Sequence, residues 1–225
     1  MSNTYQRLKW KLLPIFRKER MARFLELMQP QPGATILDVG GLPSLNGVPG
    51  FWQGYSDAFN ITLVNLPGSF NRFNKAELAP FRLIETDVCS CAGLSQKYDI
   101  VFSNSVVEHV GSRRRQGLFA EFIHSAGDSF WIQTPSPIFP MEAHCDIPFW
   151  WFIPFHLRKK KIASWKCAGD KFLAHQMAST RPIWSSELRL LFPDCQIVTE
   201  PLLGFPKSLI AYRRPKPRRE RSPHL

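Results

Sequence analysis

Short apolar runs of strand length follow one another between residues 35 and 134. They read TILDV at 35–39, ITLVN at 61–65, RLIE at 82–85, DIVFS at 99–103 and FWIQT at 130–134. Several show little alternation between apolar and polar residues, which is typical of parallel strands covered on both faces. The segment 113–126 instead places its apolar side chains on one face of a helix. Strands separated by helices predict an α/β fold with a doubly wound, mostly parallel sheet.

The end of the domain predicts a helix followed by two antiparallel strands. Ser185 is suited to cap a helix that continues through Leu191 and is stopped by Pro193. The segments CQIVTE at 195–200 and SLIAYR at 208–213 are both of strand type and are separated by a short loop. A parallel return would need a longer crossover, so these strands must be antiparallel neighbours. We therefore expect a seven-stranded sheet that ends in an antiparallel hairpin.

These patterns divide the chain into three parts. Residues 1–32 are expected to form a helical extension, interrupted near Pro14, because apolar groups recur there at helical spacing. Residues 33–213 form the α/β domain, and within it 136–183 is an insertion after the fifth strand. Residues 214–225 are rich in Pro and Arg, so we expect a disordered basic tail.

Charge is distributed unevenly along the sequence. The chain has 29 Lys and Arg against 18 Asp and Glu, a formal net charge of +11. Residues 1–20, the run 158–161 and residues 213–221 together hold more positive charge than the whole chain, so the remainder is slightly acidic. Such segregation fits an anionic partner, such as phospholipid, nucleic acid or a phosphorylated acceptor. It fits equally well solvated segments that have no partner.

The five cysteines form an odd set, and the N terminus lacks the pattern of a secretory signal peptide. We therefore expect a reducing compartment, the cytoplasm, and no disulfide framework. Cys89 and Cys91 could join Cys145, Cys167 and His144 around zinc, but their spacing is not CxxC and no second pair repeats it. Buried or inert thiols are the preferred interpretation, and no metal site is expected.

No uninterrupted apolar stretch reaches the roughly 18 residues that a membrane-spanning helix needs. The most apolar segment, 147–157, is short and contains Pro148 and Pro154. Aromatic residues at 149–152 stand close to the basic run 158–161, a combination that suits peripheral contact with an anionic membrane at its inner face. The favoured alternative is a hydrophobic lid packed on the sheet with a solvated basic edge, because proline breaks the helix that an anchor would use.

The turn after TILDV carries Asp38, Gly40 and Gly41 at the carboxyl end of the first strand, where open α/β sheets bind ligands. A dinucleotide enzyme would show GxGxxG, which this spacing does not fit. A carboxylate at the strand tip would repel a pyrophosphate. S-adenosylmethionine has no phosphate and carries an ammonium and a sulfonium, so Asp38 favours that cofactor. The alternative is an Asp-x-Gly turn without a ligand.

Polar residues follow the next three strands as well. Asn65 ends the second strand and can bond ribose hydroxyls, and Asp87 follows the third and can accept from the adenine amino group. Ser103 and Asn104 end the fourth strand, beside the expected cofactor. Each residue alone is more often a loop cap, but polar residues at four successive strand ends indicate one binding site.

With these residues in place, the sequence resembles the class I S-adenosylmethionine-dependent methyltransferases. Five segments carry the resemblance: ILDVGG, VNLPG, IETDVCS, YDIVFSNSVVEHV and the closing SSELRLLFPDCQIVTEPLLGFPKSLIAYR. The resemblance implies a Rossmann-like fold and S-adenosylmethionine as cofactor. It assigns Asp38, Gly40 and Gly41 to the methionine portion, Asn65 to the ribose and Asp87 to the adenine. Asn65 departs from the usual acid, and the third glycine is displaced to position 47, so we expect a longer or differently shaped loop.

Methyl transfer is an in-line displacement, and a hydroxyl acceptor usually needs a base. The insertion 136–183 begins at the carboxyl end of a central strand and can cover the pocket as an acceptor lid. Its FPMEAH, followed by IPF, resembles a signature of bacterial methyltransferases that act on small molecules, glycans or lipids. His144 has the chemistry of the base, with an orienting or structural role as the alternative. His109 is expected to support its loop, and Glu142 and Asp146 are weaker candidates.

The sequence therefore predicts transfer of a methyl group from S-adenosylmethionine to a small-molecule, saccharide or lipid-linked acceptor, at oxygen. Nucleic-acid methylation is a second interpretation, but FSNSVVEH stands where a (D/N)PPY motif would be, and no specific nucleic-acid partner is expected. A basic tail alone gives only nonspecific, salt-sensitive binding. The third interpretation is a methyltransferase-like binding or scaffold protein without turnover.

Overall fold

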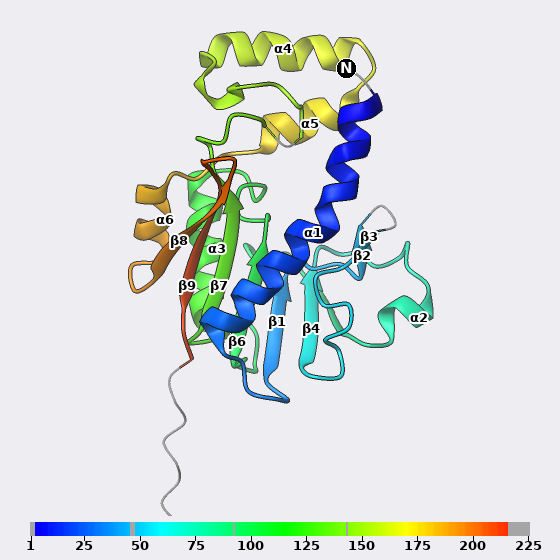
Figure 1. The fold of residues 1–225 in the computed structure, drawn as a ribbon, viewed down its shortest axis with the longest axis vertical. Helices are drawn as coiled ribbons and strands as arrows, with labels where there is room; N and C mark the ends of the chain where they lie inside the picture. Colours follow the sequence, from blue (N-terminus) through cyan, green and yellow to red (C-terminus); the bar gives the residue numbers. More distant parts are fainter. Residues whose placement is uncertain (1–2, 46–47, 92, 143, 216–225) are drawn as a thin grey trace, which may run out of the picture.

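A seven-stranded sheet forms the centre of the computed structural model (Figure 1), which describes residues 3–45, 48–91, 93–142 and 144–215. Of residues 3–13 and of Pro49 only the backbone is described. The expected basic tail, from 216 onward, and Gly47 lie outside the described residues. In spatial order the strands are β5 (Arg82–Glu85), β4 (Asn60–Asn65), β1 (Thr35–Val39), β6 (Ile100–Asn104), β7 (Phe130–Pro135), β9 (Phe205–Arg213) and β8 (Gln196–Leu202).

The strand directions confirm the doubly wound sheet with a closing hairpin. β5, β4, β1, β6 and β7 pair in parallel, and β9 runs antiparallel to both β7 and β8. The chain leaves β1 toward β4 on one side and later returns to β6 on the other. The strand order therefore reverses at β1, and the crevice beside its carboxyl end is the natural place for a ligand.

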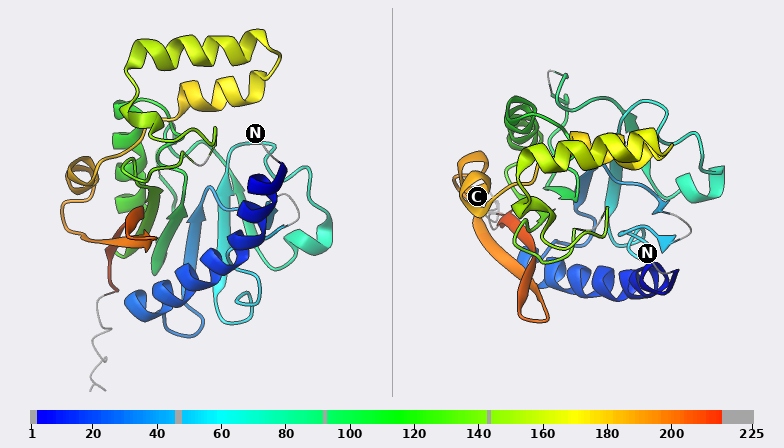
Figure 2. Two further views of the ribbon diagram at one scale, coloured as in Figure 1. Left: turned by 45° about the horizontal axis from the view of Figure 1, so that its top comes forward. Right: turned by 90° about the horizontal axis from the view of Figure 1, so that it is seen from above.

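Each face of the sheet is covered by its own helices, which is why the central strands read as nearly continuous apolar runs. Leu37 and Val39 of β1 pack with α3 (Arg113–Ala126) and α6 (Ser185–Leu191) on one face. Ile36 packs on the other face with Phe24 and Met28 of α1 (Asn3–Met28). Figures 1 and 2 show α1 lying across that face of the sheet.

Several sequence-based bounds need correction. α1 runs through Pro14 without the expected interruption, because an exposed proline costs a helix one hydrogen bond and can bend it rather than end it. Ser185 is the first residue of α6 rather than its cap, and the Glu187 carboxylate accepts the N–H of Trp184 instead. The loop after β1 contains a small hairpin that was not predicted, formed by β2 (Ser44–Leu45) and β3 (Val48–Pro49).

The insertion after β7 forms a helical layer above the carboxyl ends of the parallel strands (Figure 2). It comprises η1 (Trp150–Phe152), α4 (Phe155–Cys167) and α5 (Lys171–Ser179). Pro154 precedes the first turn of α4, where a missing N–H costs nothing, so it begins a helix rather than breaking one. Cys145, Trp150 and Met177 are buried in a cluster drawn entirely from this insertion. No helix in the described part of the chain is long and apolar enough to cross a bilayer.

Replacing Phe24 by Ala tests how firmly α1 belongs to the core. Its ring is fully buried and meets Trp52, Phe102 and Trp131 edge-on, with centroids 5.5–5.6 Å apart. We expect Phe24→Ala to lower the free energy of unfolding by about 3–5 kcal/mol, measured by urea denaturation. Ile15→Ala on the exposed side of the same helix should change it by less than about 0.5 kcal/mol. Equal effects of the two substitutions would contradict this assignment.

Candidate functional site

A cavity of about 300 Å³ lies at the carboxyl ends of β1, β4, β5 and β6. Three predicted cofactor residues line it: Gly40, Asn65 and Asp87. Further lining comes from Ser105 and His109 of the loop after β6 and from Arg115 of α3. The other four predicted residues, Asp38, Gly41, Ser103 and Asn104, lie around it without forming its wall. Their roles, like that of the lining residues, stay predictions.

Two glycines let the chain turn sharply after β1. Gly40 has a φ of 82°, and a Cβ there would overlap the Val106 side chain across the cavity wall. A Cβ on Gly41 would overlap the Asp38 carboxylate. Gly40 and Gly41 are therefore required by packing, which brings the backbone of this turn close to whatever occupies the cavity.

Asp38 lies beneath the turn rather than in the cavity. It is buried and accepts a hydrogen bond of 2.8 Å from the indole N–H of Trp52. Burial raises the pKa of Asp38 to about 7, although the bond from Trp52 acts in the opposite direction. The sequence predicts an accessible negative charge at this position, whereas the structure places a buried carboxyl here whose pKa is raised by burial.

Asn65 ties two loops together at the cavity mouth. Its Oδ1 accepts from the Leu66 N–H at 2.8 Å and from the Ser69 hydroxyl at 3.2 Å, and its Nδ2 donates to the Gly41 carbonyl at 3.2 Å. An amide can donate and accept at once, which a carboxylate cannot. This explains in local terms why Asn can stand at the end of β4, where the resemblance leads one to expect an acid.

Asp87 faces Arg115 across the cavity, a partner that the sequence did not reveal. Arg115 Nη2 lies 3.0 and 2.8 Å from the two carboxylate oxygens. The bond from Arg115, together with bonds from Cys89 N–H and the Ser90 hydroxyl, keeps the pKa of Asp87 below its usual value, although burial opposes this. The arginine run at 113–115 was the only feature of the sequence that pointed to a cationic partner for Asp87, and such a run is equally typical of the solvated start of a helix.

Ser103 and Asn104 serve the framework of the site. The Ser103 hydroxyl is fully buried and donates to the Val39 carbonyl at 2.9 Å, which joins β6 to β1. The Asn104 Oδ1 accepts from Arg20 Nη1 at 2.7 Å. Arg20 is itself buried and binds both oxygens of Glu200. Asn104 therefore links the cofactor edge to α1 and to the closing hairpin, a contact that local sequence patterns did not predict.

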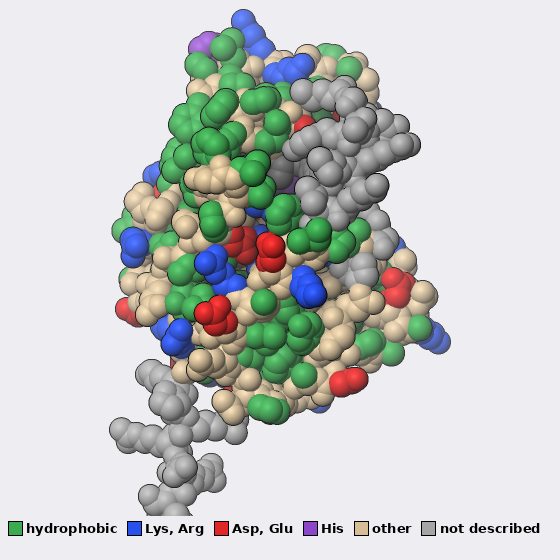
Figure 3. All heavy atoms as spheres, viewed as in Figure 1, with side chains coloured by type: hydrophobic (Ala, Val, Ile, Leu, Met, Phe, Trp, Pro, Cys, Tyr) green, Lys and Arg blue, Asp and Glu red, His purple; other side chains and the backbone are tan. Residues whose placement is uncertain are grey.

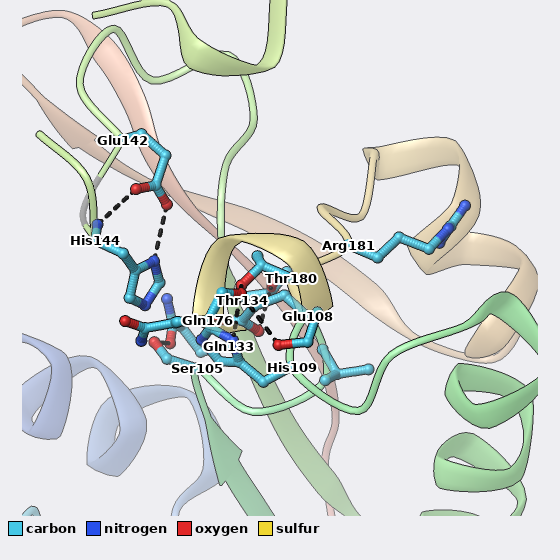
Figure 4. A network of polar contacts seen from close by, with 12 residues as sticks. Ser105, Glu108, His109, Gln133, Thr134, Glu142, His144, Gln176, Thr180 and Arg181 are labelled. Carbon is cyan, nitrogen blue, oxygen red and sulfur yellow. Dashed lines mark hydrogen bonds and ion pairs between the residues drawn. The ribbon is translucent and has the colours of Figure 1, made fainter. Parts of the chain in front are cut away.

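A second polar cluster lies beside the cavity, beneath the insertion (Figure 4). Glu142 accepts from the backbone N–H groups of His144 and Cys145, at 2.6 and 2.8 Å, and from His144 Nδ1 at 2.8 Å. Burial opposes ionisation of Glu142, but the bonds from His144 and Cys145 hold its pKa below the usual value. With Nδ1–H donated to Glu142, Nε2 is left as the acceptor, without a hydrogen-bond partner among the described residues.

His109 connects this cluster to the cavity at the strand ends, which it lines. Its ring meets the His144 ring edge-on, with centroids 4.8 Å apart. Its Nδ1 lies 3.1 Å from the Thr180 hydroxyl, which donates to the Gln176 carbonyl, so Nδ1 carries the proton. Burial lowers the pKa of His109 to about 4, so its ring is neutral near pH 7. These contacts hold the loop after β6 against α5.

Glu108 is the most deeply buried carboxyl of the cluster. Only 2% of the residue is exposed, and Oε2 accepts from the Thr134 hydroxyl at 3.0 Å. Within the described part of the chain Oε1 has no hydrogen-bond partner and lies 3.8 Å from His109 Nε2. Burial raises the pKa of Glu108 to about 7. An acid of this kind keeps its proton more readily than a surface carboxyl and can donate a hydrogen bond.

Comparison with solved structures relates this architecture to methyltransferases. N-methyltransferase NodS from Bradyrhizobium japonicum WM9, in complex with S-adenosyl-L-homocysteine, aligns with a TM-score of 0.56 at 12% identity, over 94% of this chain and 97% of NodS. The glycopeptide N-methyltransferase MtfA aligns with a TM-score of 0.52 at 10% identity, over 87% and 89% of the two chains. Magnesium protoporphyrin IX methyltransferase ChlM from Synechocystis PCC 6803, with bound S-adenosyl-L-homocysteine, gives 0.51 at 13% identity, over 88% and 80%.

These likenesses confirm the Rossmann-like methyltransferase fold expected from the sequence. Their sequence identities are low, so what they show is the fold. The sequence itself matches no protein-family model and no curated protein.

The buried Asp38 carboxyl predicts a pH dependence of stability. In the folded chain it keeps its proton up to about pH 7, whereas in the unfolded chain it loses it near its ordinary value of 3.8. Its contribution therefore favours folding at low pH and is lost as the pH rises through about 7. We expect Asp38→Asn, which keeps an acceptor for Trp52, to gain stability relative to the parent chain between about pH 5 and about pH 8.

Urea unfolding followed by tryptophan fluorescence at both pH values measures this difference. Asp57→Asn, an exposed carboxyl in the same loop region, is the matched control and should show no such trend. If the difference between Asp38→Asn and the parent chain does not vary with pH, the carboxyl is ionised in the folded protein and the assignment is wrong.

Proposed function

We propose that this protein transfers a methyl group from S-adenosylmethionine to an acceptor held beneath the insertion 136–183. The observation that carries the proposal is the cavity at the reversal point of a methyltransferase-type sheet, with Gly40, Asn65 and Asp87 in its wall. NodS and ChlM, which share the fold, hold S-adenosyl-L-homocysteine. In this proposal the Gly40 turn contacts the methionine portion, and Asn65 and Asp87 lie toward the ribose and adenine.

The second step of the proposal concerns the acceptor atom. A hydroxyl gives up its proton as its oxygen bonds the methyl carbon and the carbon–sulfur bond breaks, so the reaction gains from a base. His144 suits this role because Glu142 orients its ring and its Nε2 can receive the proton. The ionised Glu142 would then stabilise the imidazolium that forms, as a carboxylate does for a histidine base in acyl transfer.

Transfer to nitrogen is the second candidate, because NodS and MtfA are N-methyltransferases. An amine acceptor must be neutral, and an oriented histidine could remove its proton before transfer. We favour oxygen because the buried Glu142 holds the partly exposed His144 ring in one orientation, as a base requires, and a neutral amine already carries a free electron pair. The acceptor class proposed is a small molecule, a saccharide or a lipid-linked acceptor.

Gly40→Ala tests the cofactor site. The added methyl group would overlap the Val106 side chain and distort the turn. We therefore expect the affinity for S-adenosyl-L-homocysteine to fall by about tenfold or more, which corresponds to about 1.4 kcal/mol of binding free energy. Isothermal titration calorimetry measures it. Gly54→Ala is the matched control, because Gly54 has nearly the same positive φ but no atom within 4 Å of its added Cβ. No binding by the parent chain at millimolar ligand would refute the proposed function.

His144→Ala tests the base. Once an acceptor has been found by screening for a mass gain of one methyl group, we expect the rate of transfer to fall by about 10²–10⁴-fold. Affinity for S-adenosyl-L-homocysteine should stay the same. His175→Ala, an exposed histidine on α5, is the control. Unchanged turnover in His144→Ala would remove His144 from the mechanism, and cofactor binding without transfer to any acceptor would favour a binding protein.

A further inference from the structure

The outer side of the insertion exposes large aromatic side chains that the proposed chemistry does not use. We call Phe149, Phe152 and Phe155 of the insertion, together with Trp184 just after it, the aromatic patch; Phe152 is 57% exposed and Phe155 63%. Edge-on ring contacts join Phe152 to Phe149 and to Trp184, with centroids 6.4 and 6.2 Å apart. Figure 3 shows hydrophobic side chains gathered over this part of the molecule. Contiguous exposed apolar surface of this kind marks an interaction site.

The charge around the aromatic patch has one sign. Residues 147–169 include five Lys and Arg and no Asp or Glu. The cations are interleaved with the rings: Lys159 Nζ lies 4.6 Å from the centre of the Phe155 ring, and Arg158 Cζ lies 5.1 Å from that of Trp151. α4 carries all five of them and has no fully buried residue. Ile162 and Trp165 pack against the buried cluster of the insertion, and the exposed lysines on the rest of the helix are available to an anionic partner.

The patch is joined to the loop that carries His144. The Phe149 N–H donates to the Pro140 carbonyl at 2.7 Å, and the Glu142 N–H donates to the Ile147 carbonyl at 3.3 Å. Phe149 itself has a φ of 52°, a conformation that is unfavourable for a bulky residue. The backbone thus keeps the Phe149 ring exposed at a cost in conformational energy. Phe149 lies at the base of the loop that ends beside the cofactor cavity. Strain of this kind is usually kept at functional positions.

We propose that the aromatic patch and the basic face of α4 dock the protein on the surface of an anionic membrane, with the rings in the headgroup region. Rings that enter the interface and lysines that meet anionic lipid are the two components of such contacts. A second copy of this chain fits less well, because it would bring cations against cations. A nucleic-acid duplex would satisfy the cations but not the exposed phenyl rings, because its bases are already stacked on one another. Docking here lays the acceptor side of the molecule against the bilayer.

This placement also names the acceptor class, and that part rests on the proposed function. A membrane-bound acceptor would reach His144 from the docked side without leaving the lipid surface. Among the three acceptor classes, docking therefore selects the lipid-linked one.

Vesicle flotation of the full chain tests the docking surface. We expect flotation with vesicles of phosphatidylcholine and phosphatidylglycerol, and little with phosphatidylcholine alone. Phe152→Ser and Phe155→Ser should each lower the partition coefficient by about tenfold, and Lys159→Glu by about fivefold or more. Leu190→Ser is the matched control, because Leu190 is 82% exposed on α6, outside the patch, and should leave flotation unchanged.

Calorimetry with S-adenosyl-L-homocysteine on the same variants separates the two proposals. Flotation without cofactor binding would refute the proposed function and still support the docking surface. Cofactor binding with flotation that the phenylalanine substitutions do not weaken would overturn the docking surface. Absent flotation, together with a shift of an oligonucleotide in gels that Lys159→Glu abolishes, would overturn it too and assign the surface to nucleic acid.

Discussion

The buried pairing of Arg20 with Glu200 is the contact on which the arrangement of the other elements depends. One guanidinium joins α1 to β8 through Glu200, to the end of β6 through Asn104, and to β9 through the Ser208 hydroxyl at 3.4 Å. Removing either charge would leave the other largely buried without its counter-charge, which costs more than the pair itself contributes. The helix that covers one face of the sheet and the hairpin that closes its edge are thus held at one point, directly beside the loop that carries Ser105 and His109.

That loop gives the two halves of the site a common wall. His109 lines the cavity at the strand ends on one side and packs against the His144 ring on the other. The buried groups around it, Glu108 and Thr180, are held by single hydrogen bonds to strand and helix. A low-dielectric setting strengthens each of these bonds and raises the cost of leaving one unmade. Movement of α5 would therefore affect both the cavity and the Glu142–His144 pair.

Most of the sheet could be predicted from the sequence, because apolar runs of strand length and helical spacing are local properties. The bounds of β1, β5 and α3 agree with expectation, and the edge that carries the cavity followed from parallel strands ending together. Pairings between residues that are separated in the sequence could not be predicted, because the residues next to each one do not indicate its partner. Such pairs are Asp87 with Arg115, Asp38 with Trp52 and Arg20 with Glu200. Pro154 was misjudged because a proline that breaks one helix can also begin the next.

The separation of 180 residues between Arg20 and Glu200 has a consequence for biosynthesis. α1 emerges from the ribosome before the hairpin does. The Arg20 guanidinium therefore stays hydrated, and Phe24 lacks part of its set of neighbours, until nearly the whole domain has emerged. Contacts between such distant segments form late, because the entropy of closing the long loop between them is lost before the contacts can stabilise the fold. α1 is therefore made before the elements that fix it in place, and until they form, its apolar side chains are exposed to chaperones.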